Sequence, residues 1–244
     1  MSTELSKPVK PLGIRAYGHI PHLSDSRMGP GDHHCHEGQA RICTERVRDR
    51  HDEVIVTEKL DGTCVAVARQ GDTLCALSRR GYLCASSPFE MHHVFGAWVE
   101  QNSQRFFDLL YDGSRIVGEW LAQAHGTRYK LTGEPFVAFD LMVGHERLAY
   151  GDFLARIGGR LVVPHELHRG GALSIPEALA RLGQHGFHGA IDAVEGAVWR
   201  VERRGRFDFL AKYVKPWKVD GCYLPEQSGQ AAIWNWRPEA ETQI

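Results

Sequence analysis

Paired runs of alternating apolar residues, joined by short turns, constrain the fold of this chain most strongly. Residues 54–68 predict a strand, an interruption and a second strand, and Gln70-Gly71-Asp72 predicts a tight turn into a third strand at residues 73–77. Strands joined by turns this short pair antiparallel. Antiparallel sheets are therefore expected.

Four later segments extend this pattern. Residues 115–121 and 136–142 predict two more strands, and residues 193–202 and 207–214 predict a second hairpin around Arg203-Arg204-Gly205.

A capping box formed by Ser87 and Glu90 predicts the start of a helix, and Pro88 fits its first position. The helix is expected to run to about residue 110. Its predicted inward-facing residues are Phe89, His93, Phe95, Trp98 and Val99.

A second capping box, Ser174 with Glu177, predicts a helix through Gln184, and a short helix should follow Gly151. Helices segregated from antiparallel hairpins are typical of the α+β class.

The chain length of 244 residues suits one large domain with a substantial core. We expect the main domain at residues 51–220. An irregular N-terminal extension, residues 1–50, is expected to pack on this domain. Residues 221–244 are expected to form a C-terminal tail.

Composition excludes several classes of protein. The net charge of −1 is not that of a polycation, and no apolar run is long enough to span a bilayer. The polar first ten residues carry no signal-peptide core, so a cytoplasmic location without a membrane partner is expected. Six scattered cysteines without a C-x-x-C pair indicate reduced thiols.

Six short motifs carry the residue types that chemistry needs, and they follow one another in order. Each is ordinary alone, whereas the ordered set is not. They are Glu58-Lys59-Leu60-Asp61-Gly62, Ser78-Arg79-Arg80-Gly81, Val117-Gly118-Glu119-Trp120, Phe139-Asp140, Glu195-Gly196-Ala197-Val198 and Lys212-Tyr213-Val214-Lys215.

In this order the set resembles motifs I, Ia, III, IIIa, IV and V of the covalent nucleotidyltransferases, which include DNA ligases, RNA ligases and mRNA capping enzymes. The resemblance covers residues 58–215 and is greatest to ATP-dependent RNA ligases similar to phage RNA ligase 2. It implies an ATP-grasp-like ligase domain with antiparallel sheets flanked by helices.

The resemblance implies that Lys59 attacks the α-phosphate of ATP and forms a lysyl-AMP intermediate. AMP would pass to an RNA 5′-phosphate, and a 3′-hydroxyl would then displace it and seal the strand. Free lysine has a pKa of about 10.4, so the nucleophile must lose a proton. Burial, a divalent cation and the charges of Lys212 and Lys215 are expected to lower the pKa of Lys59.

The resemblance also implies a nucleotide pocket. Glu119 and Arg79 would hold the ribose hydroxyls, Phe139 would stack on adenine, and the backbone of Glu58 would lie at the adenine edge. Further predicted nucleotide contacts are Asp61, Gly62, Lys212 and Lys215. Glu195 and Asp61 are the predicted oxygen ligands for Mg²⁺ or Mn²⁺.

The sequence departs from the family pattern at two places. Two residues separate Lys212 from Lys215, where the family usually has one, and Arg80 competes with Arg79 for the motif position. The residues after 215 are too few for the OB-fold domain of DNA ligases, so a stand-alone catalytic domain is expected.

Rival hypotheses remain open within and outside this superfamily. They are a DNA nick ligase, a GTP-using guanylyltransferase, and a domain that binds nucleotide or RNA ends without turnover. The physiological RNA and the oligomeric state are not fixed by the sequence.

The N-terminal segment has its own cluster of histidines. Residues 32–36 (DHHCH) allow a polar loop or, less readily, a zinc site. A third hypothesis is that basic residues close over the ATP phosphates in place of a second domain. Its members are Arg15, Arg27, His33, His36 and Arg41.

Two further groups allow either a structural or an RNA-binding interpretation. The aromatic group is expected either to fix the C-terminus to the domain or to stack on unpaired bases; it consists of Trp217, Tyr223, Trp234 and Trp236. The basic group lies around the second hairpin, as a solvated turn or an RNA contact; it consists of Arg200, Arg203, Arg204 and Arg206.

Overall fold

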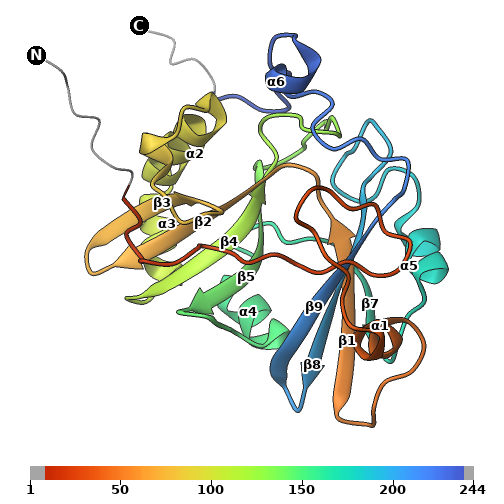
Figure 1. Ribbon diagram of the computed structural model, residues 1–244. Helices are drawn as coiled ribbons and strands as arrows, with labels where there is room; N and C mark the ends of the chain where they lie inside the picture. Colours follow the sequence, from red (N-terminus) through yellow and green to blue (C-terminus); the bar gives the residue numbers. More distant parts are fainter. Residues whose placement is uncertain (1–8, 239–244) are drawn as a thin grey trace, which may run out of the picture.

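A computed structural model describes residues 9–238, in which two antiparallel sheets stand side by side with helices on their outer faces (Figure 1). The predicted α+β class is confirmed. Among these residues no helix is long and apolar enough to cross a membrane.

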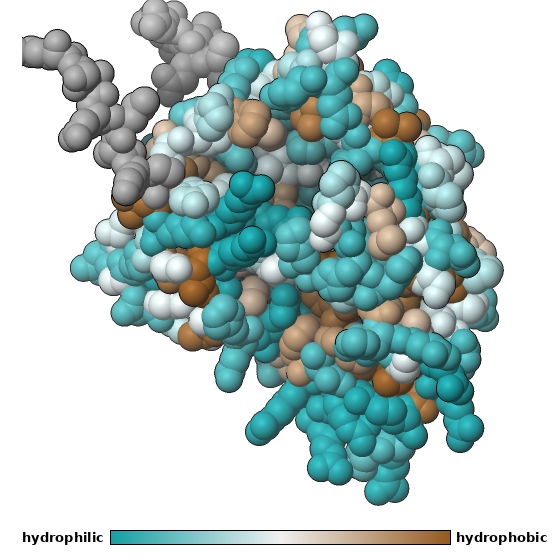
Figure 2. Space-filling model, in the orientation of Figure 1, coloured by the Kyte–Doolittle hydropathy of each residue, from teal (hydrophilic) through white to brown (hydrophobic). Residues whose placement is uncertain are grey.

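The four-stranded sheet has the order β7-β1-β8-β9, and each neighbouring pair is antiparallel. Its strands are β1 (Asp52–Lys59), β7 (Glu166–Gly170), β8 (Gly196–Arg203) and β9 (Arg206–Val214). The predicted β8–β9 hairpin is confirmed, and its two turn residues, Arg204 and Gly205, both have positive φ. The hairpin tip and the start of β1 form a hydrophilic projection (Figure 2).

The five-stranded sheet has the order β3-β2-β4-β5-β6. Its strands are β2 (Thr63–Gln70), β3 (Thr73–Ser78), β4 (Ser114–Trp120), β5 (Phe136–Val143) and β6 (Glu146–Arg147). The β2–β3 turn lies at Gly71 (φ 57°), as predicted. The interruption predicted within residues 54–68 is the point at which the chain leaves one sheet and enters the other, between Lys59 and Thr63.

The prediction of one continuous helix from Ser87 to residue 110 is wrong. Two helices, α2 (Glu90–Gln101) and α3 (Ser103–Leu109), occupy this region, and Phe89 is the N-cap of α2. The Ser87 hydroxyl instead contacts His92 Nδ1 at 2.6 Å. The helix breaks at Asn102, whose side-chain amide donates to the Trp98 carbonyl and so competes with the helical backbone.

Three of the five residues predicted to face inward are buried. Phe95, Trp98 and Val99 are buried as predicted, whereas Phe89 and His93 are exposed. Phe95 and Trp98 pack on Trp120 of β4, with ring centroids 5.2 and 5.5 Å away. The helix thereby covers the outer face of the five-stranded sheet.

The remaining helices are short. They are α1 (Glu37–Thr44), α4 (Tyr150–Ile157), α5 (Ile175–Leu182) and α6 (Pro225–Ser228), with a 3₁₀ turn at Cys84–Ser86. The Ser174 capping box is confirmed at the start of α5, which ends at Leu182 and not Gln184. Helix α1 was not expected within the first fifty residues; His36 and Gln39 form its capping box.

The N-terminal segment crosses from the five-stranded to the four-stranded sheet (Figure 1). The Tyr17 amide donates to the Arg79 carbonyl, and Leu23 and Pro21 exchange backbone hydrogen bonds with Lys212 of β9. Tyr17 and Leu23 are buried. The segment therefore joins both sheets on one side.

Glycine at position 81 fixes this crossing. Gly81 has φ 86°, and an added Cβ would lie 2.1 Å from the Ile14 carbonyl oxygen. Gly71 has φ 57° with no atom within 4 Å of such a Cβ. We expect Gly71→Ala to cost only the backbone strain of about 1–2 kcal/mol, and Gly81→Ala to cost clearly more free energy of unfolding. Urea denaturation of both variants measures the difference, and equal losses would contradict the proposed packing of the N-terminal segment.

Candidate active site

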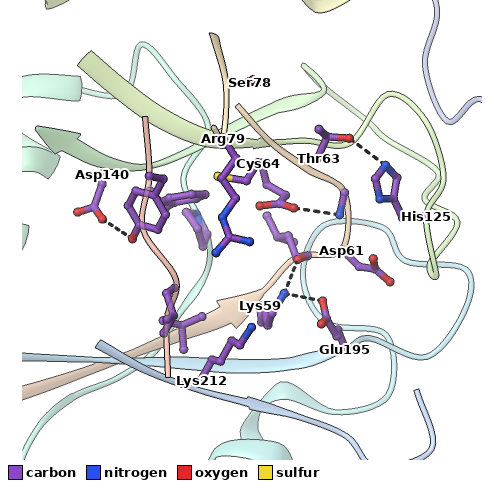
Figure 3. Close-up of a pocket in the computed structure, with 18 of the residues that line it drawn as sticks. Lys59, Asp61, Thr63, Cys64, Ser78, Arg79, His125, Asp140, Glu195 and Lys212 are labelled. Atoms are coloured by element: carbon purple, nitrogen blue, oxygen red, sulfur yellow. Dashed lines mark hydrogen bonds and ion pairs between the residues drawn. The ribbon is translucent and has the colours of Figure 1, made fainter. Parts of the chain in front are cut away.

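A cavity of about 890 Å³ opens between the two sheets at the β1–β2 connection (Figure 3). Both sheets and the N-terminal segment contribute to its lining. The structure brings the following predicted residues to it: Glu58, Lys59, Asp61, Gly62, Arg79, Glu119, Phe139, Glu195 and Lys212.

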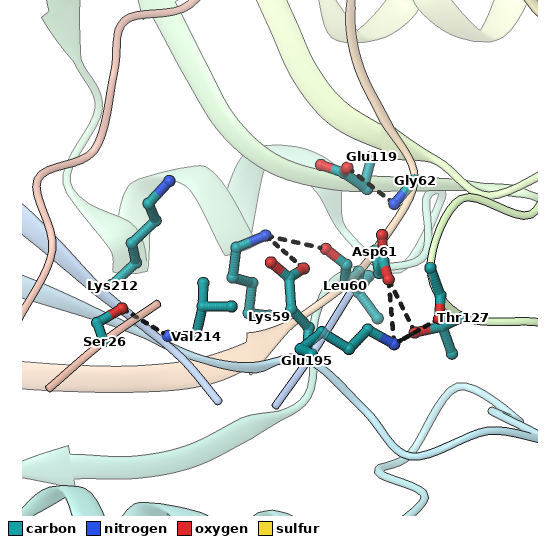
Figure 4. Close-up of polar contacts among 12 residues, drawn as sticks. Ser26, Lys59, Leu60, Asp61, Gly62, Glu119, Thr127, Glu195, Lys212 and Val214 are labelled. Carbon is teal, nitrogen blue, oxygen red and sulfur yellow. Dashed lines mark hydrogen bonds and ion pairs between the residues drawn. The ribbon is translucent and has the colours of Figure 1, made fainter. Parts of the chain in front are cut away.

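Lys59 is the last residue of β1 and lies in the middle of the cavity (Figures 3 and 4). Its Nζ is 2.7 Å from Glu195 Oε2 and 3.4 Å from the Leu60 carbonyl oxygen. The β1–β8 register explains the contact, because Lys59 pairs with Gly196 and Glu195 is the residue before it.

Carboxylates dominate the electrostatics of Lys59. Burial alone would lower the pKa of Lys59, but the negative charges of Glu195 and Glu119 outweigh it and raise the pKa. The expected depression by neighbouring cations is therefore wrong for the protein's own residues. Burial in turn raises the pKa of Glu195 and of Glu119 to about 7, against the opposing charge of Lys59.

Asp61 is held by three groups. Its amide donates to the Tyr129 hydroxyl oxygen, and its Oδ2 accepts from Thr127 at 2.9 Å and lies 3.2 Å from Lys218 Nζ (Figure 4). Lys218 is buried and also donates to the Gly126 carbonyl at 2.7 Å. One oxygen of Asp61 is thus engaged with Thr127 and Lys218, as one oxygen of Glu195 is engaged with Lys59.

Gly62 and Glu119 form one unit. The Gly62 amide donates to Glu119 Oε1 at 3.1 Å, and an added Cβ at Gly62 would lie 2.5 Å from the Trp120 carbonyl oxygen. Only glycine fits this approach of the connection to β4. The Glu119 carboxylate is thereby fixed beside the Lys59 amine.

The other end of the cavity is aromatic. Phe139 packs edge-on against Tyr17, with ring centroids 5.1 Å apart. Arg79 donates to the Gly18 carbonyl at 2.9 Å, and Arg80 also lines the cavity. A flat apolar surface next to hydrogen-bonding groups suits a nucleoside.

Glu58 faces away from Lys59, as alternation along β1 requires. Its Oε2 accepts from the Phe187 amide at 3.1 Å and contacts His188 Nδ1 at 2.8 Å. The side chain therefore supports the loop around residue 187, and only the backbone remains for a ligand.

The two lysines of the last motif are separated in space. Lys212 lines the cavity, and its Nζ is 3.8 Å from Asp32 Oδ1. Burial and the charge of Lys59 lower the pKa of Lys212. Lys215 is not among the lining residues, and its Nζ lies 5.5 Å from the centre of the Trp217 ring. Its position gives no support to a contact with the ATP phosphates.

The basic N-terminal cap is not formed. None of Arg15, Arg27, His33, His36 and Arg41 lines the cavity. The segment contributes Tyr17, Ile20 and Asp32 instead, and Asp32 is 3.0 Å from His22. Across residues 9–238 no three His, Cys, Asp or Glu side chains converge as metal ligands, so the zinc alternative finds no support.

Two of the four hairpin arginines are engaged within the protein. Arg200 is buried and pairs with Asp140 at 2.7 Å, which excludes it from an exposed RNA contact. Arg203 pairs with Asp49 and Asp52, while Arg204 and Arg206 are exposed.

The C-terminal aromatic residues also fall into two groups, those packed on the core and those partly or largely exposed. Trp234 and Trp236 pack against the core around Trp120, as expected for a segment fixed to the domain. Tyr223 is half-buried, and Trp217 is 59% exposed.

Sequence reasoning missed several residues at the site. Tyr17, Thr63 and His125 line the cavity, the last two 2.8 Å from each other, and Lys218 pairs with Asp61; Asp32 was considered only as part of the histidine cluster. Only the tertiary fold brings them there. A buried lysine after a motif leaves no periodic signal in the sequence.

Two antiparallel sheets thus meet at a lysine that is surrounded by carboxylates and a second lysine. The chain belongs to the RNA ligase family, whose model matches residues 52–214.

Solved structures share this fold at low identity. A variant of Naegleria gruberi RNA ligase with AMP and Mn is 16% identical with a TM-score of 0.50, and the match covers 68% of this chain and 50% of that chain. A putative ATP-dependent DNA ligase from Aquifex aeolicus is 21% identical with a TM-score of 0.48, covering 81% and 49%. An archaeal ATP-dependent RNA ligase is 19% identical with a TM-score of 0.46, covering 67% and 42%.

The chain thus spans about half the length of the solved structures that it matches. No curated protein sequence matches it.

The Asp61–Lys218 pair gives a stability prediction. Removing one partner leaves a buried charge uncompensated, so Lys218→Met should cost about 3–5 kcal/mol of the free energy of unfolding. The double variant with Asp61→Asn should recover part of that loss. Lys130→Met, at an exposed lysine, is the control. Denaturation of the unaltered protein, of Lys218→Met and Asp61→Asn singly, of the double variant and of the control checks this. Additive losses in the double variant would contradict direct coupling.

Proposed function

We propose that the protein is an ATP-dependent RNA ligase that forms a covalent lysyl-AMP at Lys59. AMP then passes to an RNA 5′-phosphate, and an RNA 3′-hydroxyl displaces it, which would serve RNA repair. The observation that carries the proposal is the position of Lys59. In a chain of the RNA ligase family, its Nζ lies in a nucleotide-sized cavity, 2.7 Å from Glu195.

The base and the α-phosphate of ATP would lie at opposite ends of the cavity. Phe139 would stack on adenine while the Glu58 backbone meets the base edge. Glu119 and Arg79 would hold the ribose hydroxyls, which places the α-phosphate between Lys59 and Lys212. Lys212 would offset the charge that grows on the phosphate during attack.

Lys59 must lose a proton before it attacks, and Glu195 is the group in contact with it. An ordinary carboxylate is a weak base, but a pKa of about 7 brings Glu195 into the range of general bases at neutral pH. The lysine amine becomes neutral when its proton passes to Glu195, or to water once a cation offsets the negative charge of Glu195.

The donor set suits a hard divalent cation. Glu195 and Asp61 both line the cavity, and each has one carboxylate oxygen bound within the protein, to Lys59 and to Thr127 and Lys218 respectively. Mg²⁺ keeps several waters and takes few protein ligands, which fits one or two carboxylates. Mg²⁺ or Mn²⁺ bound at Glu195 would supply positive charge that lowers the pKa of the Lys59 amine and polarises the phosphate.

The first test is self-labelling. With α-labelled ATP and Mg²⁺ or Mn²⁺, the protein should acquire a covalent label that is lost in Lys59→Ala and kept in Lys130→Ala. Gel electrophoresis of the denatured protein measures it. Label that persists in Lys59→Ala would refute the proposed nucleophile.

Competition and sealing separate the rivals. Label from GTP and not ATP indicates a guanylyltransferase, and sealing of DNA but not RNA nicks indicates a DNA ligase. RNA binding without any label indicates a non-catalytic domain. The proposal requires ATP-dependent joining of RNA ends that carry a 3′-hydroxyl and a 5′-phosphate.

The pH dependence gives a second prediction. Glu195 and Glu119 have pKa values of about 7, so they become fully ionised only above that pH. Self-labelling should therefore rise as the pH is raised through about 7, and Glu119→Gln should make the rise shallower. Ordinary glutamates finish titrating near pH 5–6 (pKa about 4.3), so a flat rate between about pH 6 and 8 would contradict the assignment.

A further inference from the structure

Trp217 stands apart from the other tryptophans of the chain. It is 59% exposed, whereas Trp98, Trp120 and Trp199 are buried and Trp234 and Trp236 pack on the core. A large exposed indole gains nothing from folding, since its apolar surface stays in water. Its neighbour Val219 is also exposed, at 51%.

The turn that carries Trp217 is fixed to the candidate active site. The Lys215 amide donates to the Glu195 carbonyl at 2.9 Å, and the Lys218 amide donates to the Lys215 carbonyl at 3.0 Å. The Lys218 side chain pairs with Asp61 inside the protein. The two residues that anchor the turn therefore hold Glu195 and Asp61 as well, and the indole has a defined place beside the cavity.

Trp217 lies outside the cavity and yet next to its rim. It is not a lining residue, whereas Asp220, three residues later, is one. The proposed nucleotide contacts of the cavity do not involve Trp217.

Charge distinguishes the ligand that this surface fits. Lys215 Nζ lies over one face of the indole, 5.5 Å from its centre, so the cation stands on that face and a base would stack on the other. Bases stack on aromatic side chains regardless of sequence, and a lysine beside the ring meets the adjoining phosphate. A purely apolar partner would leave the ammonium group without a counter-charge.

We propose that Trp217 and Lys215 form a stacking platform for an unpaired base of the RNA strand whose end enters the cavity. This proposal rests on the proposed function, because it assigns a substrate contact to the same site. It also gives Lys215 a role that its position supports.

The experiment compares binding of a 3′-fluorescein-labelled single-stranded oligoadenylate by anisotropy, in the absence of ATP. Stacking of one base contributes enough that Trp217→Leu should weaken binding about fivefold or more. Trp217→Tyr should restore most of the affinity. An abasic strand of equal length should bind the unaltered protein and Trp217→Leu with equal affinity. Tyr111→Leu is the matched control, because Tyr111 is 42% exposed, has Arg156 over its ring at 6.0 Å and does not line the cavity.

Several results would overturn the platform. They are unchanged affinity in Trp217→Leu, an equal loss for the abasic strand, an equal loss in Tyr111→Leu, or conversion of a dimer to a monomer by Trp217→Leu in sedimentation. The last result would assign the indole to a contact between copies. Thermal unfolding of each variant excludes misfolding as the cause. Absence of self-labelling in the unaltered protein refutes the ligase activity and leaves the binding comparison intact, so the two failures are distinguishable.

Discussion

The passage of the chain from one sheet to the other between Lys59 and Thr63 is the constraint on which the site depends. Within those few residues the backbone must leave β1, approach β4 closely and enter β2. Gly62 permits the approach, and its amide donates to Glu119. The same connection places Lys59 at the end of one sheet, in contact with Glu195 and within the electrostatic influence of Glu119 from the other sheet.

Opposed charges in a confined space follow from this geometry. Each carboxylate near Lys59 favours its ammonium form, and the limited access of water makes the carboxylates harder to ionise. Lys59 is consequently held in the form that cannot attack a phosphate. A ligand that offsets the charge of Glu195 releases the amine, which links nucleophile activation to occupancy of the site.

Regular local patterns were predictable from the sequence, and long-range contacts were not. The turn at Gly71 and the Ser174 capping box depend on neighbouring residues, and both are present. The Ser87 box has the same sequence form, but its serine binds His92, so the helix starts later. The ordered motifs pointed to Lys59, Glu119 and Glu195, which lie at the end of β1, near the end of β4 and directly before β8.

Lys215 and Lys218 show where such reasoning ends. The resemblance to motif V paired Lys215 with Lys212 in spite of their unusual spacing, but β9 ends at Val214 and Lys215 lies beyond the strand. Lys218 lies three residues further on and returns inward to pair with Asp61. Which lysine is buried depends on the path of a turn, and no periodicity in the sequence encodes that path.

Contacts between the sheets explain how the nucleotide end of the cavity keeps its shape. Asp140 of β5 accepts from Arg200 of β8 and from the Tyr17 hydroxyl of the N-terminal segment. Three parts of the chain thus converge on one buried carboxylate beside Phe139. A base stacked on Phe139 would contact a surface whose position depends on both sheets, and its binding free energy would add to the cohesion between them. Nucleotide binding and the alignment of Lys59 with Glu195 are therefore coupled through the same inter-sheet contacts.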